Sequence, residues 1–391
     1  MRALIIGVGA AGNKAAIDLM QNNVVAKEDV ILINSTLRDV PEEYRDIATE
    51  IEGPNGCGQE RSLAKEIILQ AMKNNTFDPE KYILPIQHEK IIVIASLCGA
   101  TGSGMAPVLA RYYSKVINIP TEIIGLVGFE DESARALRNI MEFCQDLDDS
   151  FTVQFVRNTA FLKAAQNNRS KAEKLANLEV VKRVRVLLGN YMIDSEQNID
   201  ETDIVKLNNR EGYKTVEYIE ILDKIKTMDQ YNDYLKEMLD NSKSFDPDGS
   251  KIGLLGVIMN LQSASQEFID RSYHLIREKL GEPYEIYTKI QYNPQYPEFI
   301  AFIASGMKMP EEQIKKLYEK YQVLTDSVNK KDDDFYDSVQ ELQGSEEDKK
   351  FDSFERGRFK REINNDDQAA IERDKFFVGY EREDRKNPKA Q

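Results

Sequence analysis

The 391-residue chain has few cysteines, no long apolar run and no Gly-Lys-Ser or Gly-Lys-Thr sequence. Its three cysteines, two of which fall in glycine-rich segments, argue against a disulfide framework and predict a reducing cytoplasm. Because a helix needs about 20 apolar residues in succession to span a bilayer, we expect no membrane-spanning segment. The usual P-loop, in which a lysine reaches the terminal phosphates, is also excluded. Any phosphate binding must therefore depend on backbone amides and hydroxyl groups.

Charge and length set further limits. The chain has 52 Lys and Arg against 67 Asp and Glu, a net charge of −15. This charge argues against direct nucleic-acid binding by the folded body but leaves an adaptor open. The length and the 41% hydrophobic content allow two folded domains and a tail. Because the chain starts with a strand pattern, Met-Arg-Ala-Leu-Ile-Ile, we expect no signal peptide.

Two glycine-rich loops carry most of the information. Residues 96–107 read Ser-Leu-Cys-Gly-Ala-Thr-Gly-Ser-Gly-Met-Ala-Pro, follow the apolar run 91–95 and begin a helical pattern. Their glycines, with Thr101 and Ser103, let successive N–H groups turn toward one anion, and the helix N-terminus adds its positive end. Residues 7–13, Gly-Val-Gly-Ala-Ala-Gly-Asn, form a second such loop after the strand 2–6. Two phosphate loops on neighbouring strands would hold one nucleotide twice.

Taken alone, residues 7–12 match Gly-x-Gly-x-x-Gly, the dinucleotide fingerprint, and equally fit a plain tight turn. An NAD site needs an acidic residue at the end of the second strand to bind the ribose. Here the strand 30–33 ends in Asn34, Ser35 and Thr36. A dinucleotide-binding oxidoreductase is therefore a distant alternative, favoured by this loop alone.

With these loops, over about its first three quarters, the chain resembles the tubulin/FtsZ superfamily of GTP-dependent filament proteins, with the phage and plasmid TubZ branch as the nearest match. The family's signature loop, Gly-Gly-Gly-Thr-Gly-Thr-Gly, is similar to residues 98–104, where small residues replace small residues. Further similarities follow in the family's order. Residues 53–61 resemble the loop that senses the terminal phosphate, Phe129, Glu130 and Arg135 the sugar-side loop, and 156–159 the loop that meets guanine.

The resemblance implies a site for GTP or GDP with Mg²⁺, and no residue is assigned as a metal ligand. Guanine presents an acceptor beside two donors, which asparagine side chains match, so Asn13, Asn158 and Asn177 are the candidates for the base. Asn177 falls on the long central helix. The nucleotide-binding positions that the resemblance implies are Gly9, Ala10, Ala11, Asn13, Asn34, Gly56, Cys57, Gly58, Cys98, Gly99, Ala100, Thr101, Gly102, Ser103, Glu130, Asn158 and Asn177.

Residues 198–203, Asn-Ile-Asp-Glu-Thr-Asp, resemble the family's catalytic loop, Asn-x-Asp-x-x-Asp. The resemblance assigns catalysis to Asn198, Asp200 and Asp203. In the family this loop lies opposite the nucleotide and touches only the next subunit's GTP, so the resemblance implies a GTPase that is completed in trans on polymerisation. The alternative is ordinary N-capping of a helix over 201–208.

The order of apolar runs predicts an α/β fold. We expect a doubly wound parallel-sheet GTP-binding domain over 1–170, a long central helix and catalytic loop over 171–200, and a smaller α+β activation domain over 201–308. The last part, 309–391, would be a C-terminal helix and a charged, flexible tail. Strands are expected near 215–222, 251–261, 284–292 and 298–305, with a helix over 265–279 between two of them.

Beyond about residue 329 charged runs cannot bury a core, but a basic island (356–361) and an aromatic island (376–380) stand out. They indicate binding of a DNA-binding adaptor or of phage or plasmid cargo. We therefore expect a TubZ-like filament protein in the cytoplasm of a bacterial host, with itself as partner and no membrane contact, which positions plasmid or phage DNA. An FtsZ-type division protein is the alternative, although the C-terminus shows no apolar anchor.

Overall fold

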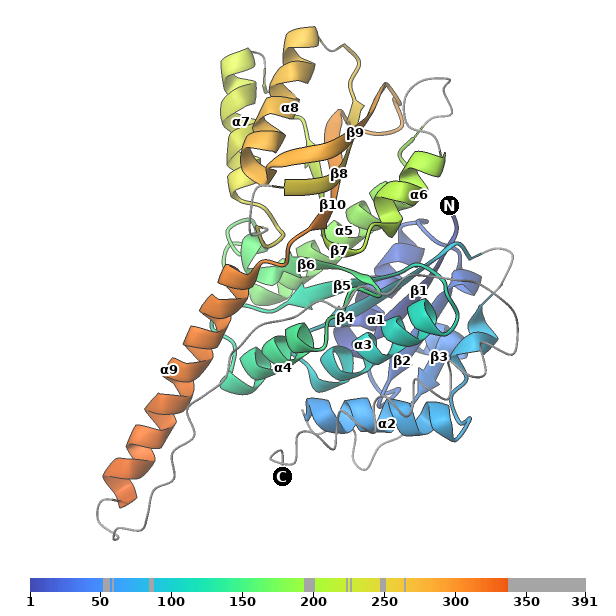
Figure 1. The fold of residues 1–391 in the computed structure, drawn as a ribbon, viewed down its shortest axis with the longest axis vertical. Coiled ribbons are helices and arrows are strands. Elements are labelled where there is room, and N and C mark those ends of the chain that lie inside the picture. The colour runs from blue at the N-terminus through green and yellow to red at the C-terminus, as the bar shows by residue number, and fades with distance from the viewer. Residues whose placement is uncertain are drawn as a thin grey trace. The chain divides into compact units, whose positions relative to one another are not determined.

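The computed structural model describes residues 1–51, 57, 60–83, 88–192, 201–222, 224–225, 227–246, 251–263 and 265–336 (Figure 1). The chain divides into two compact units, Met1–Tyr318 and Glu319–Gln391. None of the described helices combines the length and apolar content needed to cross a bilayer.

The described part of the first unit contains a ten-stranded sheet in the order β3-β2-β1-β4-β5-β6-β7-β10-β8-β9. The strands from β3 to β7 are parallel, β10 is antiparallel to both of its neighbours, and β9 is parallel to β8. The strands are β1 (Ala3–Val8), β2 (Val30–Asn34), β3 (Ala48–Glu50), β4 (Lys90–Ser96), β5 (Thr121–Val127), β6 (Thr152–Arg157), β7 (Gly212–Glu220), β8 (Lys251–Asn260), β9 (Glu282–Gln291) and β10 (Phe299–Met307).

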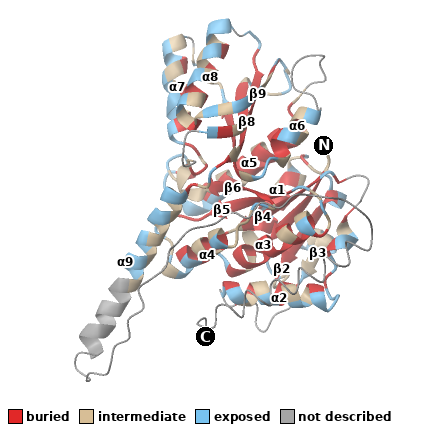
Figure 2. Cartoon of the chain, viewed as in Figure 1, coloured by how far each residue is buried: buried red, intermediate tan, exposed pale blue. Residues whose placement is uncertain are grey.

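Helices flank this sheet, and Figure 2 shows the buried strands between them. β1 is buried along its whole length, as expected of a strand covered on both faces. The helices are α1 (Gly9–Gln21), α2 (Arg61–Lys73), α3 (Ala100–Lys115), α4 (Ala134–Gln145), α5 (Arg169–Leu187), α6 (Glu201–Asn209), α7 (Met228–Asp240), α8 (Gln266–Leu280) and α9 (Glu311–Tyr336), with short 3₁₀ helices η1 (Lys27–Asp29), η2 (Glu42–Ile47), η3 (Pro79–Tyr82) and η4 (Asn158–Phe161).

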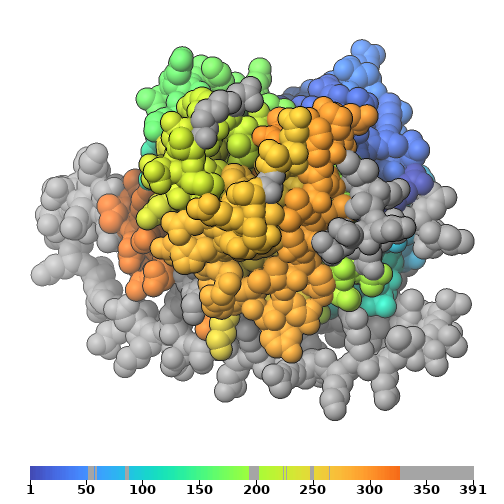
Figure 3. All heavy atoms as spheres, turned by 90° about the horizontal axis from the view of Figure 1, so that it is seen from above, coloured from blue at the N-terminus to red at the C-terminus, as the bar shows by residue number. Residues whose placement is uncertain are grey.

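The architecture confirms the predicted α/β class with a mostly parallel sheet, and β7, α8, β8, β9 and β10 fall close to their expected places. α7 was not predicted. Its signal is nevertheless local: Thr227 and Gln230 form a capping box, and Tyr231, Leu235 and Leu239 recur at intervals of four and are buried. Figure 3 shows α7, α8 and β9 side by side on one face of the first unit.

The last helix differs from expectation in length. α9 begins at Glu311 in the first unit and continues in the second to Tyr336, so helical backbone covers residues 330–336, which the charge pattern assigned to a flexible tail. High charge argues against a buried core, but a helix needs no buried face to satisfy its own backbone hydrogen bonds. The basic and aromatic islands at 356–361 and 376–380 lie outside the described residues.

Candidate functional site

The two glycine loops lie side by side at one edge of the sheet. Each is a turn from a strand into a helix: β1 ends at Val8 before α1, and β4 ends at Ser96 before α3. β1 and β4 are parallel neighbours, with Val8 paired to Ala95. The predicted placement on neighbouring strands is therefore confirmed, and both turns lie at the carboxyl edge, where open parallel sheets bind their ligands.

The two turns also touch each other. Gly9 has a φ of +74°, and a methyl group added there would lie 3.3 Å from the amide nitrogen of Gly102. At Gly102 an added methyl group would lie 2.4 Å from the carbonyl oxygen of Ser96. A larger residue at position 9 would push the two turns apart, and one at position 102 would distort the turn between β4 and α3, so both glycines are needed for this close approach.

Both helix N-termini are uncapped in the described structure. Neither α1 nor α3 has a side chain that accepts a hydrogen bond from its first turn, and neither carries an acidic residue there. By contrast, Ser133 caps α4 and Ser265 caps α8. The first N–H groups of α1 and α3 are thus left to an external acceptor, and the helix dipoles favour an anion.

Three asparagines at the same edge have buried amide atoms without hydrogen-bond partners among the described residues. Asn13, in α1, is 2% exposed and leaves both its Oδ1 and its Nδ2 unpaired. Asn34, the last residue of β2, leaves its Nδ2 unpaired, and Asn158, directly after β6, leaves its Oδ1 unpaired. An unpaired buried polar atom costs about 1–3 kcal/mol, and a polar ligand at this edge would supply the partners.

Two hydroxyl groups of the turn between β4 and α3, those of Thr101 and Ser103, differ in their hydrogen-bond partners. The Thr101 Oγ1 lies 3.3 Å from the Oγ of Ser35, the residue after β2. Ser103, in contrast, is fully buried and donates its hydroxyl to the carbonyl oxygen of Gly99 at 2.6 Å. Ser103 therefore braces the turn itself, whereas the Thr101 hydroxyl reaches the residue after β2.

Cys98 also supports the turn. Its Sγ accepts a hydrogen bond from the N–H of Gly128 at 3.2 Å, and burial raises the pKa of its thiol to about 12. Its carbonyl oxygen accepts a bond from Asn139 of α4 at 2.9 Å. The thiol stays protonated and acts as a small packing group. All three cysteines are free thiols, as the sequence predicted.

Asn177 of α5 meets a residue that the sequence did not single out. Its Nδ2 donates to the Oδ2 of Asp18 in α1 at 3.0 Å. Burial raises the pKa of Asp18, and the hydrogen bond from Asn177 and the charge of Lys174 partly oppose this shift. Asp18 interrupts an apolar stretch of α1, which was its only signal. The pair therefore places the carboxyl group of Asp18 next to the side-chain amide of Asn177.

The other assigned residues have different settings. Ala10 and Ala11 form the first turn of α1, Gly99 and Ala100 begin α3, Glu130 lies in an exposed turn after β5, and Cys57 is buried. Arg61, at the start of α2, donates its Nε to the carbonyl oxygen of Ser103 at 3.2 Å. Gly56, Gly58, Asn198 and Asp200 lie outside the described residues.

Asp203, which the structure describes and to which the resemblance assigns catalysis, lies far from these turns. It is in the first turn of α6, where Lys206 Nζ is 3.3 Å from its Oδ1. Lys206 also lies over the ring of Tyr287 in β9, the strand at the far end of the sheet from β1 and β4. At its other end, α6 meets Lys90, the first residue of β4. Because β4 has seven residues, about 20 Å separates Lys90 from the turn after Ser96.

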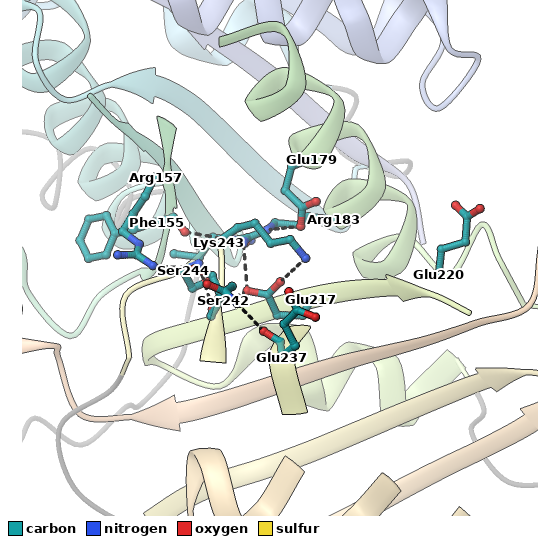
Figure 4. Close-up of polar contacts among 12 residues, drawn as sticks. Phe155, Arg157, Glu179, Arg183, Glu217, Glu220, Glu237, Ser242, Lys243 and Ser244 are labelled. Atoms are coloured by element: carbon teal, nitrogen blue, oxygen red, sulfur yellow. Dashed lines mark hydrogen bonds and ion pairs between the residues drawn. The ribbon is translucent and has the colours of Figure 1, made fainter. Parts of the chain in front are cut away.

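A buried ionic cluster lies beneath α5 (Figure 4). Arg183 is fully buried and pairs with Glu179 of the same helix at 3.3 Å and with Glu217 of β7 at 3.4 Å. Lys243 reaches the other oxygen of Glu217 at 3.4 Å. The cluster holds the central helix against the sheet, and no sequence pattern indicated it.

No family model matches the chain. The tubulin-like protein CetZ2 of Haloferax volcanii is 28% identical over 200 residues, covering 48% of this chain and 54% of that protein, so the chain spans about half the length of the curated relatives it matches. The GTPγS-bound CetZ2 protofilament has a TM-score of 0.65 at 18% identity, covering 84% of this chain and 100% of that one. TubZ of Clostridium botulinum phage c-st has a TM-score of 0.59 at 15% identity, with the same coverage.

A mostly parallel sheet with two converging glycine turns at its carboxyl edge defines an α/β protein of the class that binds ligands at that edge. Its fold is that of the tubulin/FtsZ superfamily, on which the relatives and the structural neighbours agree. A particular closeness to TubZ is not supported, because CetZ proteins are as similar.

Proposed function

We propose that this protein binds a guanine nucleotide at the paired glycine turns and hydrolyses GTP when it assembles head to tail. The observation that carries this proposal is the set of unpaired buried amide atoms on Asn13, Asn34 and Asn158, beside two uncapped helix N-termini. The N-termini suit the phosphates, and the amides supply the donors and acceptors that a sugar and a base need.

Recognition of the base would involve Asn13, Asn158 and the Asp18–Asn177 pair. Guanine has two donors, N1–H and the 2-amino group, next to an acceptor at O6. The carboxylate of Asp18 can accept from those donors, whereas adenine presents the opposite pattern at this edge. We therefore expect binding of GTP and GDP in preference to ATP, measured by titration of the purified protein with each nucleotide.

Replacing Thr101 tests the site directly. The Thr101 side chain lies between Gly9 and Ser35, so the long arginine of Thr101→Arg would occupy the space for the phosphates. We expect GTP affinity to fall by about 100-fold or more, because the phosphates lose their N–H donors. Ser114→Arg, at the far end of the same helix, is the control and should bind GTP like the parent. Normal binding by Thr101→Arg would show that the phosphates lie elsewhere.

Hydrolysis would require a second subunit. Asp203 lies at the amino edge of the sheet near β9, and the glycine turns lie at the carboxyl edge, so a carboxylate of α6 is out of reach of the nucleotide of its own chain. In a head-to-tail filament this edge would face the next subunit's nucleotide. There Asp203, with Asn198 and Asp200, would orient the attacking water.

Magnesium would be bound mainly by the nucleotide. Among the described residues no three His, Cys, Asp or Glu side chains come together as a metal site. Mg²⁺ commonly keeps several waters and binds phosphate oxygens, so the residues present fit a metal that arrives with GTP. When bound, it would neutralise charge on the phosphates, while the protein supplies the N–H groups.

Self-assembly is proposed from the same geometry and from the neighbours. Solved CetZ2 and Bacillus thuringiensis TubZ structures are described as GTPγS protofilaments. Sedimentation of this protein with GTP, GTPγS and GDP tests the proposal: polymer should pellet with GTPγS and disassemble as GTP is converted to GDP. A protein that hydrolyses GTP equally well at concentrations below assembly would contradict hydrolysis in trans.

For the cargo, we propose plasmid or phage DNA recruited through the segment after Tyr336. The support is the basic island at 356–361 and the fold that the chain shares with phage TubZ. Truncation after Tyr336 should preserve GTP binding but abolish capture of DNA or its adaptor by filaments in a salt-sensitive co-pelleting assay. If filaments gather instead at the division site, the FtsZ-type alternative is favoured. Competition by NAD for bound GTP would favour the oxidoreductase.

A further inference from the structure

A second fully buried group of charges lies at the amino edge of the sheet. Lys90 starts β4, Glu122 lies in β5, Lys214 lies in β7, and all three side chains are fully buried. The Nζ atoms of Lys90 and Lys214 lie 2.7 and 2.8 Å from the same carboxylate oxygen of Glu122. We call this group the lysine triad.

Both lysines of the triad also donate to one backbone oxygen of α6. The carbonyl oxygen of Asn208 accepts from Lys90 at 2.7 Å and from Lys214 at 2.8 Å. Asn208 lies in the last turn of α6, where carbonyls lack a partner within the helix and the dipole is negative. The helix end is thus held by two charge-assisted bonds, which are the strong class of hydrogen bond.

The charge balance of the triad explains why α6 is needed there. Two lysine side chains face one carboxylate, all fully buried, so the three side chains carry an excess of positive charge when both lysines are protonated. The negative end of α6 supplies the further acceptor that offsets it. Burial lowers the pKa of Lys214 to about 7; the charge of Lys90 adds to this shift, and that of Glu122 opposes it.

The triad connects several elements of the proposed GTPase. β4 starts at Lys90 and ends at the glycine turn, and the Asn208 side chain donates to the carbonyl oxygen of Leu187 at the end of α5. Glu122 accepts from Gln154 at 2.6 Å, and Gln154 in turn accepts from Arg183. A continuous polar chain therefore runs from α6 through the sheet to the central helix.

We propose that Lys90 and Lys214 are positioning residues, which set the placement of α6 and so of Asp203 relative to the strand that carries the phosphate turn. This inference rests on the proposed GTPase function. The two lysines touch neither nucleotide turn and act through the Asn208 carbonyl. Their removal should therefore change the rate of hydrolysis within filaments and leave the affinity for GTP unchanged.

The test uses Lys90→Met and Lys214→Met in the full chain at pH 6.5, where Lys214 carries its charge. Either variant leaves Glu122 paired with the remaining lysine, which avoids an isolated buried charge. We expect GTP affinity to be unchanged and the rate of hydrolysis per assembled subunit to fall by about tenfold, since a small misplacement of a catalytic group costs one to two orders of magnitude. Amides of α6 should exchange their hydrogens faster, and those of α3 should not.

Lys243→Met is the matched control. It removes a lysine from a different buried glutamate, Glu217 of β7. The contacts that the structure describes for Lys243 do not include α6. It should leave α6 exchange and hydrolysis unchanged. An equal loss in this control, or unchanged α6 exchange and hydrolysis in both triad variants, would overturn the proposal.

Two further readouts keep the proposal testable. If the methionine variants do not fold, Lys90→Gln and Lys214→Gln replace each ammonium group with a neutral hydrogen-bond donor; faster α6 exchange with slower hydrolysis supports the proposal, and no change in either overturns it. If the parent protein does not hydrolyse GTP at all, the proposed function fails. In that case the exchange of α6 amides alone still shows whether the lysines fix this helix.

Discussion

At the residue scale, the clearest features are side chains whose partners are far away in sequence. Asn177 meets Asp18 across 159 positions, and Lys90 meets the Asn208 carbonyl across 118. The local pattern around Asn13 and Asn158 was sufficient to select them by resemblance. The structure adds that both amide atoms of Asn13 and the Oδ1 of Asn158 are buried without a partner among the described residues. Their role as nucleotide ligands stays a prediction. Asp18 and the lysine triad were missed because the packing of helices α1 and α5 and the order of the strands, respectively, bring these residues to their partners.

The titration of Lys214 gives a prediction for stability. Its pKa is about 7 in the folded protein and 10.5 in an ordinary setting. Between these values the unfolded chain binds more protons, so the free energy of unfolding should rise with pH, by at most about 1.4 kcal/mol per pH unit. Below pH 7 Lys214 is charged in both states and this contribution is constant.

Urea unfolding of Lys214→Met and of the parent between pH 6.5 and 9.5 measures this contribution. The difference in unfolding free energy between the two should grow in favour of the parent as pH rises. Lys243→Met serves as the control. Burial lowers the pKa of Lys243, but the neighbouring carboxylates outweigh burial and raise this pKa above its ordinary value, so Lys243 does not titrate in this pH range. A difference that is independent of pH would contradict the low pKa of Lys214.

At the element scale, the sequence predicted the positions of the strand-to-helix turns better than the positions of the helix ends. The glycine turns after β1 and β4 lie where the glycine spacing placed them, because backbone that must approach another backbone this closely excludes side chains. The central helix, expected within 171–200 together with the catalytic loop, covers Arg169–Leu187, since Asn168 caps its start and Gly189 adopts a φ of +73° just beyond its end. α7 was overlooked despite a readable capping box.

Asp203 provides the prediction for α6. Asp203→Ala removes a side chain from the first turn of a helix that lies far from the glycine turns, so GTP binding should be nearly unchanged. If Asp203 orients water on the next subunit's nucleotide, hydrolysis should slow by about 100-fold or more, and filaments should persist. The comparison is with Lys206→Ala, which removes its ion-pair partner but no candidate catalytic group. Parallel loss of binding and hydrolysis would show that Asp203 shapes the local fold.

At the scale of the whole molecule, we propose that an apolar stripe on β9, formed by residues that the structure describes, contacts a second copy. β9 is the end strand of the described sheet, and Tyr284 is 86% exposed, with Ile286 and Ile290 also exposed along the same face. β9 lies beside α8 (Figure 3), within the part of the chain expected to supply the longitudinal contact. Exposed apolar side chains that form a continuous patch are typical of surfaces that contact another protein.

Tyr284→Glu tests this surface. The added charge would be desolvated in a contact between copies, at a cost that weakens assembly, whereas the isolated subunit keeps this side chain in water. We expect the protein concentration at which GTPγS filaments form to rise by about tenfold or more, with GTP binding by the dispersed protein unchanged. Tyr318→Glu is the control, a tyrosine of α9 outside this stripe. Because hydrolysis is proposed to need the neighbouring subunit, Tyr284→Glu should also lower GTP turnover in proportion to the filament lost, and turnover should recover when the protein concentration is raised. Turnover that stays normal while filaments disappear would separate hydrolysis from assembly and place the catalytic groups within a single chain.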